Sequence, residues 1–466
     1  MNINIERVDL VAVTPPATFP QVAPVTLTKE TMAERLGKVL AGMRAEHFDA
    51  LLIYADKEHG SNFEYLTGFV PRFEEGLLLL AANGSATVIL GNENLKMARH
   101  SRLPVQLLHC PYFSLPNQPM EHEKPLHELF SAAGLGSKQK VGLVGWKMFT
   151  GTLGNQQTLF DLPYFIVESI KQSLAPRAEL VNATHLFIGG AYGARTTNNA
   201  NEIAHYEYGA NLSSSCMMDA MDSVAVGRKE ADLGQRLTAQ GQYNTVVTIA
   251  ATGQRFENAN FYPTHKVIQR GDPLSLTTAY KGGLSSRTGF VVADESELPA
   301  NQSDYLARVA KPYYHAVAVW LESIRIGMKG GELYALIEQV LPKKEYGWHL
   351  NPGHLVADEE WMSSPIYPLS EEKISSGMML QIDIIPSIAG YTGVSAEECV
   401  AVASAELQAN IRQEYPQLWA RIAKRREYIQ QVLNIRLSDD VIPLSNTVAY
   451  LRPFFLAKDK ALAIRN

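Results

Sequence analysis

The chain has 466 residues, of which 46% are hydrophobic and 19% are charged, and its formal net charge is -6 at pH 7. A chain of this length is too long for a single hydrophobic core, so at least two domains are expected. The negative net charge gives no reason to expect nucleic acid or an anionic membrane as a partner. Three cysteines in so long a chain argue against a disulfide framework.

The N-terminal residues, MNINIERVDL, lack the basic segment followed by an apolar segment that defines a signal peptide. The longest unbroken apolar runs, such as Leu77 to Ala82, are far shorter than a membrane-spanning helix. We therefore expect a cytoplasmic protein.

The first part of the chain has the pattern of a small α/β domain. Residues 1–27 are rich in proline and aperiodic, which predicts an extended N-terminal arm. Thr28 is a predicted N-cap, because apolar residues follow it at helical spacing. Strands then alternate with helical stretches over residues 28–187, which indicates an α/β domain. The predicted strands are Ala50–Tyr54, Leu77–Ala81, Thr87–Leu90 and Val141–Val144.

The second part, residues 188–466, begins with a glycine-rich segment, after which the order of the expected strands and helices changes. Its strand–strand–helix–helix order favours an α+β domain, in which helices gather on one face of an antiparallel sheet. The expected helices cover 198–224, 229–241, 301–326, 332–345 and 409–433, and the expected strands include Thr245–Ala251, Leu274–Ala279 and Arg287–Val292.

Two residues of this second domain have ionisable side chains in positions that suggest a functional site. His354 lies in a loop bounded by proline and glycine, in the sequence NPGHL. Asp383 lies inside the apolar run Met378–Ile385, which predicts a strand covered on both faces. A carboxylate inside such a strand is costly unless another group pairs with it.

A pair of glutamates follows in the predicted strand Ser395–Val402. The period of two along a strand places Glu397 and Glu398 on opposite faces of the sheet. Only one of them can therefore share a site with Asp383 and His354, and we favour Glu397.

Segments spread over most of the chain resemble the M24 family of creatinase, aminopeptidase P, prolidase and methionine aminopeptidase. LLIYADKEHGSNFEYLTGF is similar to the small N-terminal domain of those proteins, and NNANEIAHYEYGANLSSSCMMDAM to the helix that opens their catalytic domain. RGDPLSL, YKGGLSSRTGF, PGH, GMMLQIDIIP and SAEECVAV follow in the family's order. The resemblance implies a creatinase-N-like α/β domain followed by a pita-bread domain, and it implies a homodimer.

In the hydrolytic members of the family, two aspartates, a histidine and two glutamates hold two divalent ions. Carried over by position, the histidine falls on His354, the first glutamate on Asp383 and the second on Glu397. The resemblance therefore implies a residual ligand set of these three residues. No cofactor is expected, or at most one divalent metal ion.

The two aspartates of the family have no counterpart in this sequence. The first should stand at Thr277 or Thr278, and the second within Leu284-Ser285-Ser286. Two supporting histidines of the family fall on Asn260 and Trp361. A two-metal centre is therefore not expected.

The resemblance implies hydrolysis of a C–N bond in an amide, an amidine or an Xaa-Pro peptide. His354 would transfer a proton, and Asp383 or Glu397 would orient the imidazole of His354. Arg287 would hold a substrate carboxylate through two hydrogen bonds. The remaining substrate-binding candidates are Asn260, Trp361 and Thr277.

The alternative is a non-catalytic pita-bread protein that binds a peptide, a metabolite or a protein partner. The sequence leaves both functions open.

Overall fold

The computed structural model describes residues 4–121, 123–190 and 192–465. They form two compact units. One is Leu27–Thr196, and the other combines the described residues up to Thr26 with those from Thr197 onward. Among the described helices, none combines the length and the apolar character that crossing a membrane requires.

The smaller unit is built on a mixed sheet with strand order β5-β4-β3-β2-β6-β7 among its described residues. Neighbouring strands are parallel in β2–β6, β6–β7 and β4–β5, and antiparallel elsewhere. The four predicted strands are present, and β5 was missed because it is an exposed edge strand without apolar alternation. The strands are β2 (Ala50–Ala55), β3 (Gly76–Ala81), β4 (Ala86–Leu90), β5 (Gln106–His109), β6 (Lys140–Val144) and β7 (Glu179–Asn182).

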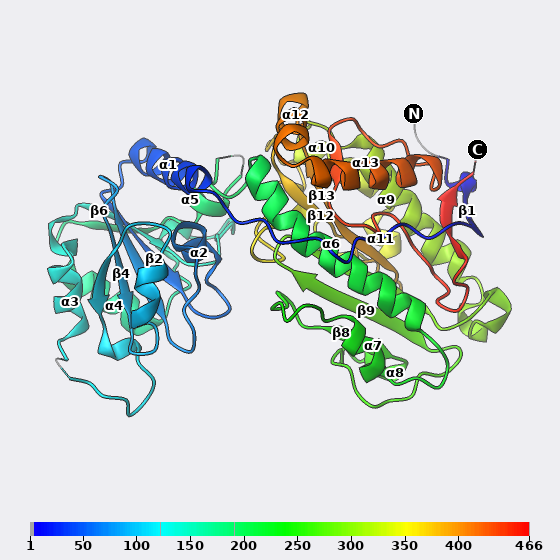
Figure 1. The fold of residues 1–466 in the computed structure, drawn as a ribbon, viewed down its shortest axis with the longest axis horizontal. Helices are drawn as coiled ribbons and strands as arrows, with labels where there is room; N and C mark the ends of the chain where they lie inside the picture. The colour runs from blue at the N-terminus through cyan, green and yellow to red at the C-terminus, as the bar shows by residue number, and fades with distance from the viewer. Residues whose placement is uncertain (1–3, 122, 191, 466) are drawn as a thin grey trace. The chain divides into compact units, whose positions relative to one another are not determined.

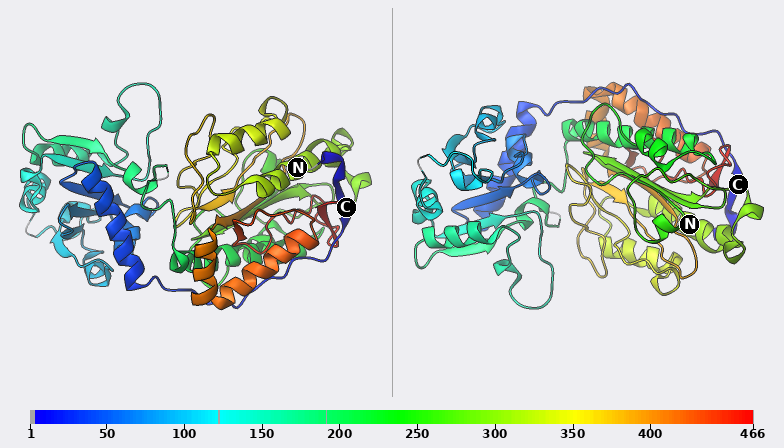
Figure 2. Two further views of the ribbon diagram at one scale, coloured as in Figure 1. Left: turned by 90° about the horizontal axis from the view of Figure 1, so that it is seen from above. Right: turned by 90° about the horizontal axis from the view of Figure 1, so that it is seen from below.

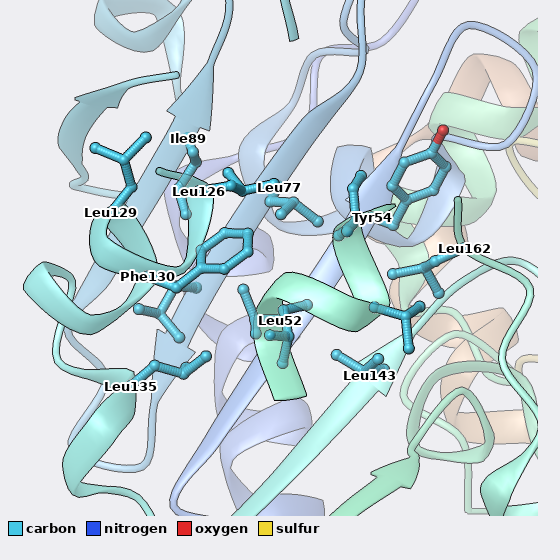
Figure 3. Packing of buried hydrophobic residues seen from close by; sticks show 14 of the residues in the cluster. Leu52, Tyr54, Leu77, Ile89, Leu126, Leu129, Phe130, Leu135, Leu143 and Leu162 are labelled. Atoms are coloured by element: carbon cyan, nitrogen blue, oxygen red, sulfur yellow. The ribbon is translucent and has the colours of Figure 1, made fainter. Parts of the chain in front are cut away.

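Helices pack on this sheet. The predicted N-cap is confirmed, because Thr28 Oγ1 accepts a hydrogen bond of 3.1 Å from the Thr31 amide. Figure 3 shows a buried cluster in which Leu129 and Phe130 of α3 join Leu52 and Leu77 of the sheet. The helices are α1 (Lys29–Ala45), α2 (Ser61–Thr67), α3 (Leu126–Ala132), α4 (Tyr164–Ser173) and α5 (His185–Ile188).

The larger unit contains an antiparallel sheet, with strand order β11-β12-β13-β10-β9-β8 among its described residues and β14 added beside β13. The long helix α6 packs against β9 and β10 (Figure 1). This architecture, an antiparallel sheet with helices after a smaller α/β unit, confirms the predicted fold class. The strands are β8 (Ile249–Thr252), β9 (Pro273–Tyr280), β10 (Gly283–Phe290), β11 (His354–Leu355), β12 (Met379–Ile382), β13 (Ser395–Val402) and β14 (Val441–Pro443). The helices are α6 (Ala200–Ser223), α7 (Glu230–Arg236), α8 (Gln254–Glu257), α9 (Lys311–Ser323), α10 (Gly330–Val340), α11 (Lys343–Tyr346), α12 (Ala405–Glu414) and α13 (Pro416–Gln431).

Two element predictions are corrected by the structure. β12 ends at Ile382, so Asp383 follows the strand and does not lie inside it. The charged helix predicted at 409–433 is two helices, because the chain leaves the helical conformation at Tyr415, immediately before Pro416. A proline disfavours helical geometry at the preceding residue and lacks the amide needed to continue the helix.

The predicted N-terminal arm packs on the larger unit. Its strand β1 (Val8–Ala12) pairs with the C-terminal strand β15 (Lys460–Ile464). Side chains of α6 donate to its backbone, from Asn211 to the Phe19 carbonyl and from Asn201 to the Thr26 carbonyl. Figure 2 shows the arm as a blue trace along the edge of this unit.

Candidate active site

Backbone geometry places His354 at one edge of the larger sheet. Gly353, just before it, has φ of +128°, and a Cβ there would lie 3.1 Å from the Gln381 carbonyl. This position therefore favours glycine. The preceding Pro352 carbonyl accepts a hydrogen bond of 2.7 Å from the Trp320 indole. The PGH sequence thus places His354 in β11, directly opposite Gln381 of β12.

A tight turn after β11 brings two further side chains onto His354. The Leu355 amide donates to the Ser363 carbonyl at 2.7 Å, which folds the segment back on itself. Glu360 Oε1 then lies 3.1 Å from His354 Nε2. The Trp361 ring lies 5.2 Å from the imidazole, at 30° to it. The predicted contact residue Trp361 is therefore beside His354, and Glu360 is a member of the site that the sequence did not predict.

The imidazole of His354 is fully buried between a backbone carbonyl and two carboxyl groups. Its Nδ1 lies 3.1 Å from the Leu355 carbonyl, which can only accept, so Nδ1 holds a proton. Its Nε2 lies 3.6 Å from Asp383 Oδ2 as well as 3.1 Å from Glu360, and makes no well-directed hydrogen bond. Burial lowers the pKa of His354, but Glu360 and then Asp383 outweigh it and raise that pKa overall.

Strand register places Glu397 on the same face of the sheet as this group, which we call the site face. Glu397 is directly opposite Ser286 of β10. Cys399, two residues further along β13, is opposite Gln381, the residue that also pairs with His354. Because side chains alternate along strands, these residues share one face. The structure thus places His354 and Glu397 on one face of one sheet, and Asp383, just after β12, lies 3.6 Å from His354 Nε2.

Asp383 and Glu397 are more than nine-tenths buried, yet neither carboxyl group has a hydrogen bond to a described residue. Burial raises the pKa of Asp383 to about 6, with His354 opposing the rise and Glu360 adding to it. Burial, followed by the charges of Asp383 and Glu360, raises the pKa of Glu397 well above its usual value. Burial therefore favours the protonated form of both carboxyl groups.

On the opposite face of the sheet, the charge of Glu398 is neutralised by an ion pair. Glu398 Oε1 lies 2.8 Å from Arg287 Nη2, and both side chains are fully buried. Ser285 and Thr447 also donate to this carboxylate. Arg287 further donates to the Tyr450 and Thr447 carbonyls. The expected role of Arg287 in holding a substrate carboxylate does not fit this closed ion pair.

The other two substrate-binding candidates have different surroundings. Thr277, in β9, lies on the site face opposite Ser286, and their hydroxyl oxygens are 2.9 Å apart. Asn260 lies exposed in the loop after α8, where its backbone amide donates to the Arg255 backbone carbonyl. Among the described hydrogen bonds and ion pairs, none joins Asn260 to His354.

Two segments of the chain match models of protein families. Residues 204–404 match metallopeptidase family M24, and residues 35–188 match the creatinase/prolidase N-terminal domain. The chain is an M24 creatinase/prolidase-like protein. No curated protein sequence matches it.

Solved structures of the same fold include an Xaa-Pro dipeptidase from Bacillus anthracis, with 18% identity and a TM-score of 0.60 over 80% of this chain and 96% of that chain. A prolidase from Pyrococcus horikoshii OT3 has 21% identity and a TM-score of 0.61 over 79% and 95%. A prolidase from Thermococcus sibiricus has 18% identity and a TM-score of 0.62 over 82% and 95%. At these identities the likeness shows the fold.

In this M24 protein, the aspartate positions implied by the resemblance fall on β9 and β10. At the points where those strands meet on the site face stand Thr277 and Ser286, whose hydroxyl groups are neutral. Within the described ranges, no group of three or more His, Cys, Asp or Glu side chains is arranged to hold a metal ion.

Proposed function

We propose that this M24 protein hydrolyses a C–N bond by general acid–base catalysis at His354, Asp383 and Glu397, without paired metal ions. One observation supports this most directly: Asp383, a buried carboxyl group without a hydrogen bond, lies 3.6 Å from the buried imidazole of His354, and its charge acts on a second such carboxyl group, Glu397. Buried acids without hydrogen bonds destabilise a fold, so their presence together in one site favours a functional role.

The proton affinities of the three groups suit opposite roles. The His354–Asp383 pair takes a proton from water, whose oxygen then bonds to the carbon of the scissile C–N bond. Glu397, which holds its proton, gives it to the leaving nitrogen as that bond breaks. Glu360, beside His354 Nε2, orients the imidazole. Water attack and nitrogen departure thus use different carboxyl groups.

The donor set does not suit two divalent ions. Two such ions need several carboxylates to offset their charge, and the hydroxyls of Thr277 and Ser286 supply none. The donors His354, Asp383 and Glu397 suit one divalent ion at most. The proposed steps use none.

The test is release of free amine from Xaa-Pro dipeptides and from small amides and amidines. We expect turnover by the wild type and its loss by about 100-fold or more in His354→Ala, the size of a general acid–base contribution. The control is His349→Ala, because His349 is an exposed histidine five residues earlier. Turnover that is unchanged in His354→Ala would disprove the proposed roles.

The second candidate is a binding protein that keeps the site without catalysis. Neutral hydroxyls at Thr277 and Ser286 favour it, because they leave ligand contacts where the family's metal ligands are expected. A dipeptide that raises the melting temperature of the wild type, with no product released, would support this candidate. For either function, a short peptide or small molecule is the proposed ligand. The homodimer and the cytoplasmic location remain predictions.

A further inference from the structure

A cavity of about 580 Å³ lies in the smaller unit, at one end of the strands of its sheet. There Gly76, the first residue of β3, pairs with Ala55, the last of β2, and with Leu90, the last of β4. Leu90 pairs in turn with His109, the last residue of β5. The segments that follow β2 and β5 and the segment that precedes β3 therefore meet at this end and line the cavity. We call it the strand-end cavity, and its volume is typical of a small-molecule site.

Aromatic side chains form one part of the lining of the strand-end cavity. Three of them are exposed, namely Phe73 at 71%, Tyr112 at 40% and Phe165 at 40%. Phe165 packs edge to face on the buried Phe113, with ring centroids 6.4 Å apart. The Arg72 guanidinium lies 5.8 Å from the centroid of the Phe73 ring, so this ring already has one cation beside it. Exposed rings that gather around one cavity indicate a contact surface for a ligand.

Carboxyl groups form the other part of the lining, and their charge is not balanced. Among the described residues of the lining, Asp56, Glu58, Glu74 and Glu75 are acidic and Lys57 supplies an ammonium group. The strand-end cavity therefore attracts cations and repels anions.

Two of these acids are held by the protein itself. Asp56 Oδ1 accepts hydrogen bonds from the backbone amides of Glu58, at 2.8 Å, and of His59, at 2.7 Å. The Glu74 carboxylate accepts from the Glu93 backbone amide at 3.1 Å. Both carboxylates are thus fixed in position without a ligand.

Glu75 has no comparable support. It is half-buried, and no hydrogen bond or ion pair from another described residue reaches its carboxyl group. Burial raises the pKa of Glu75, its own backbone amide lowers that pKa, and the charges of Asp56 and Glu74 raise it further. A cation in the cavity would offset this repulsion and would supply the hydrogen-bond donors that Glu75 lacks.

The two parts of the lining together indicate the class of ligand. Carboxylates bind N–H donors and positive charge, and aromatic rings bind both cations and apolar groups. A metal ion would leave the exposed rings without a contact, and an uncharged ligand would leave the acidic charge unbalanced. An ammonium group on an alkyl chain uses both parts of the lining.

We propose that the strand-end cavity binds an alkylammonium cation, with the ammonium group on Glu75 and the alkyl chain against Phe73, Tyr112 and Phe165. This site lies in the smaller unit and does not depend on the proposed hydrolysis at His354. A free amine and the side chain of a lysine in a peptide carry the same group, and the two sources are separated by experiment.

The first experiment measures binding to the full-length protein by calorimetry at constant ionic strength, with butylammonium and with its uncharged counterpart 1-butanol. We expect butylammonium to bind about tenfold or more tightly than 1-butanol, and Glu75→Gln to remove that advantage, as loss of a charge-assisted hydrogen bond implies. The control is Glu128→Gln, because Glu128 is an exposed acid of α3 outside the lining. Equal binding of the two ligands, or unchanged binding of butylammonium to Glu75→Gln, would overturn the inference.

The same titration with N-acetyl-lysine methylamide identifies the source of the cation. Tighter binding than that of butylammonium supports the proposal with a peptide lysine as the ligand, and weaker binding supports it with a free amine.

The second experiment removes the Phe73 ring without loss of stability. Phe73 has φ of +66°, a conformation that glycine adopts without strain and phenylalanine does not. Phe73→Gly should therefore melt no earlier than wild type, yet bind butylammonium about threefold more weakly, the effect of one exposed cation–ring contact. The matched control is Leu369→Gly in the larger unit, because Leu369 has φ of +61° and is 92% exposed. It should keep the full affinity, and an undiminished affinity in Phe73→Gly as well would overturn the role of the rings.

Discussion

Glu397 and Glu398 are neighbours in β13, and their surroundings differ in every respect that matters for function. Glu398, on the opposite face, is fully buried against Arg287 and accepts hydrogen bonds from Ser285 and Thr447. Glu397, on the site face, has no hydrogen bond to a described residue and lies near other acids. A neutralised acid maintains the fold, whereas an acid left without a partner is available to a ligand. This comparison separates the structural face of the sheet from its site face.

The largest expected effect comes from breaking the ion pair of the structural face. Arg287→Met leaves the Glu398 charge buried without a partner, which should lower the free energy of unfolding by about 3–5 kcal/mol. Denaturant unfolding followed by circular dichroism measures it. The control is Arg270→Met, because Arg270 pairs with Glu297 at the surface and should cost about 1 kcal/mol or less. Similar losses in both variants would erase the distinction between the two faces.

The site face should respond in the opposite direction when its acid is neutralised. The pKa of Glu397 is raised by folding, so its contribution to stability is full below the pKa of the unfolded chain and is lost as the pH rises. Glu397→Gln removes that loss and should stabilise the protein at pH 8 by about 1 kcal/mol or more. At pH 4 the gain should be close to zero, because the carboxyl group is protonated in the folded state and mostly protonated in the unfolded state. Thermal unfolding at the two pH values measures it, and a destabilised variant at pH 8 would show that Glu397 has a structural partner.

A smaller change is expected when Glu360 loses its charge. The charge of Glu360 raises the pKa of His354, so Glu360→Gln should lower that pKa. Titration of His354 by NMR measures the shift. Glu359→Gln, the adjacent residue, serves as the control and should leave the pKa of His354 in place. An unchanged pKa in Glu360→Gln would remove Glu360 from the site.

The smallest expected effect compares two neighbouring threonines in β9. Thr278→Val on the structural face removes a buried hydrogen bond to the Leu237 carbonyl and should cost about 1 kcal/mol of stability. Thr277→Val on the site face should cost less, because Ser286 keeps Ser395 as a partner. Melting temperatures of the two variants measure the difference. A larger loss for Thr277→Val would assign the Thr277 hydroxyl group a mainly structural role.

Much of the site could be predicted from local rules. The period of two along β13 separates Glu397 from Glu398, and the structure shows them on opposite faces. The same rule separates Arg287 from Ser286 in β10, so the burial of Arg287 away from the site was also encoded in the sequence. The alternating hydroxyls of Ser275 and Thr277 are a further period-two signal, which places both side chains on the site face.

Other features depend on three-dimensional detail that no pattern reports. Glu360 reaches His354 only because the chain reverses between Leu355 and Ser363, and that turn has no distinctive sequence. The end of β12 before Asp383 is another case, since the apolar run continues beyond the strand. Strand pairing with distant segments sets where such strands end.

The central claim is that the site works without paired metal ions, and turnover after chelation tests it most directly. Wild-type protein treated with EDTA and confirmed free of divalent metal is assayed on the Xaa-Pro dipeptide or amide that it cleaves best. We predict that its rate equals that of untreated protein and that Glu397→Gln loses it. A rate that disappears with EDTA and returns only after two equivalents of Mn²⁺ per chain would contradict the claim.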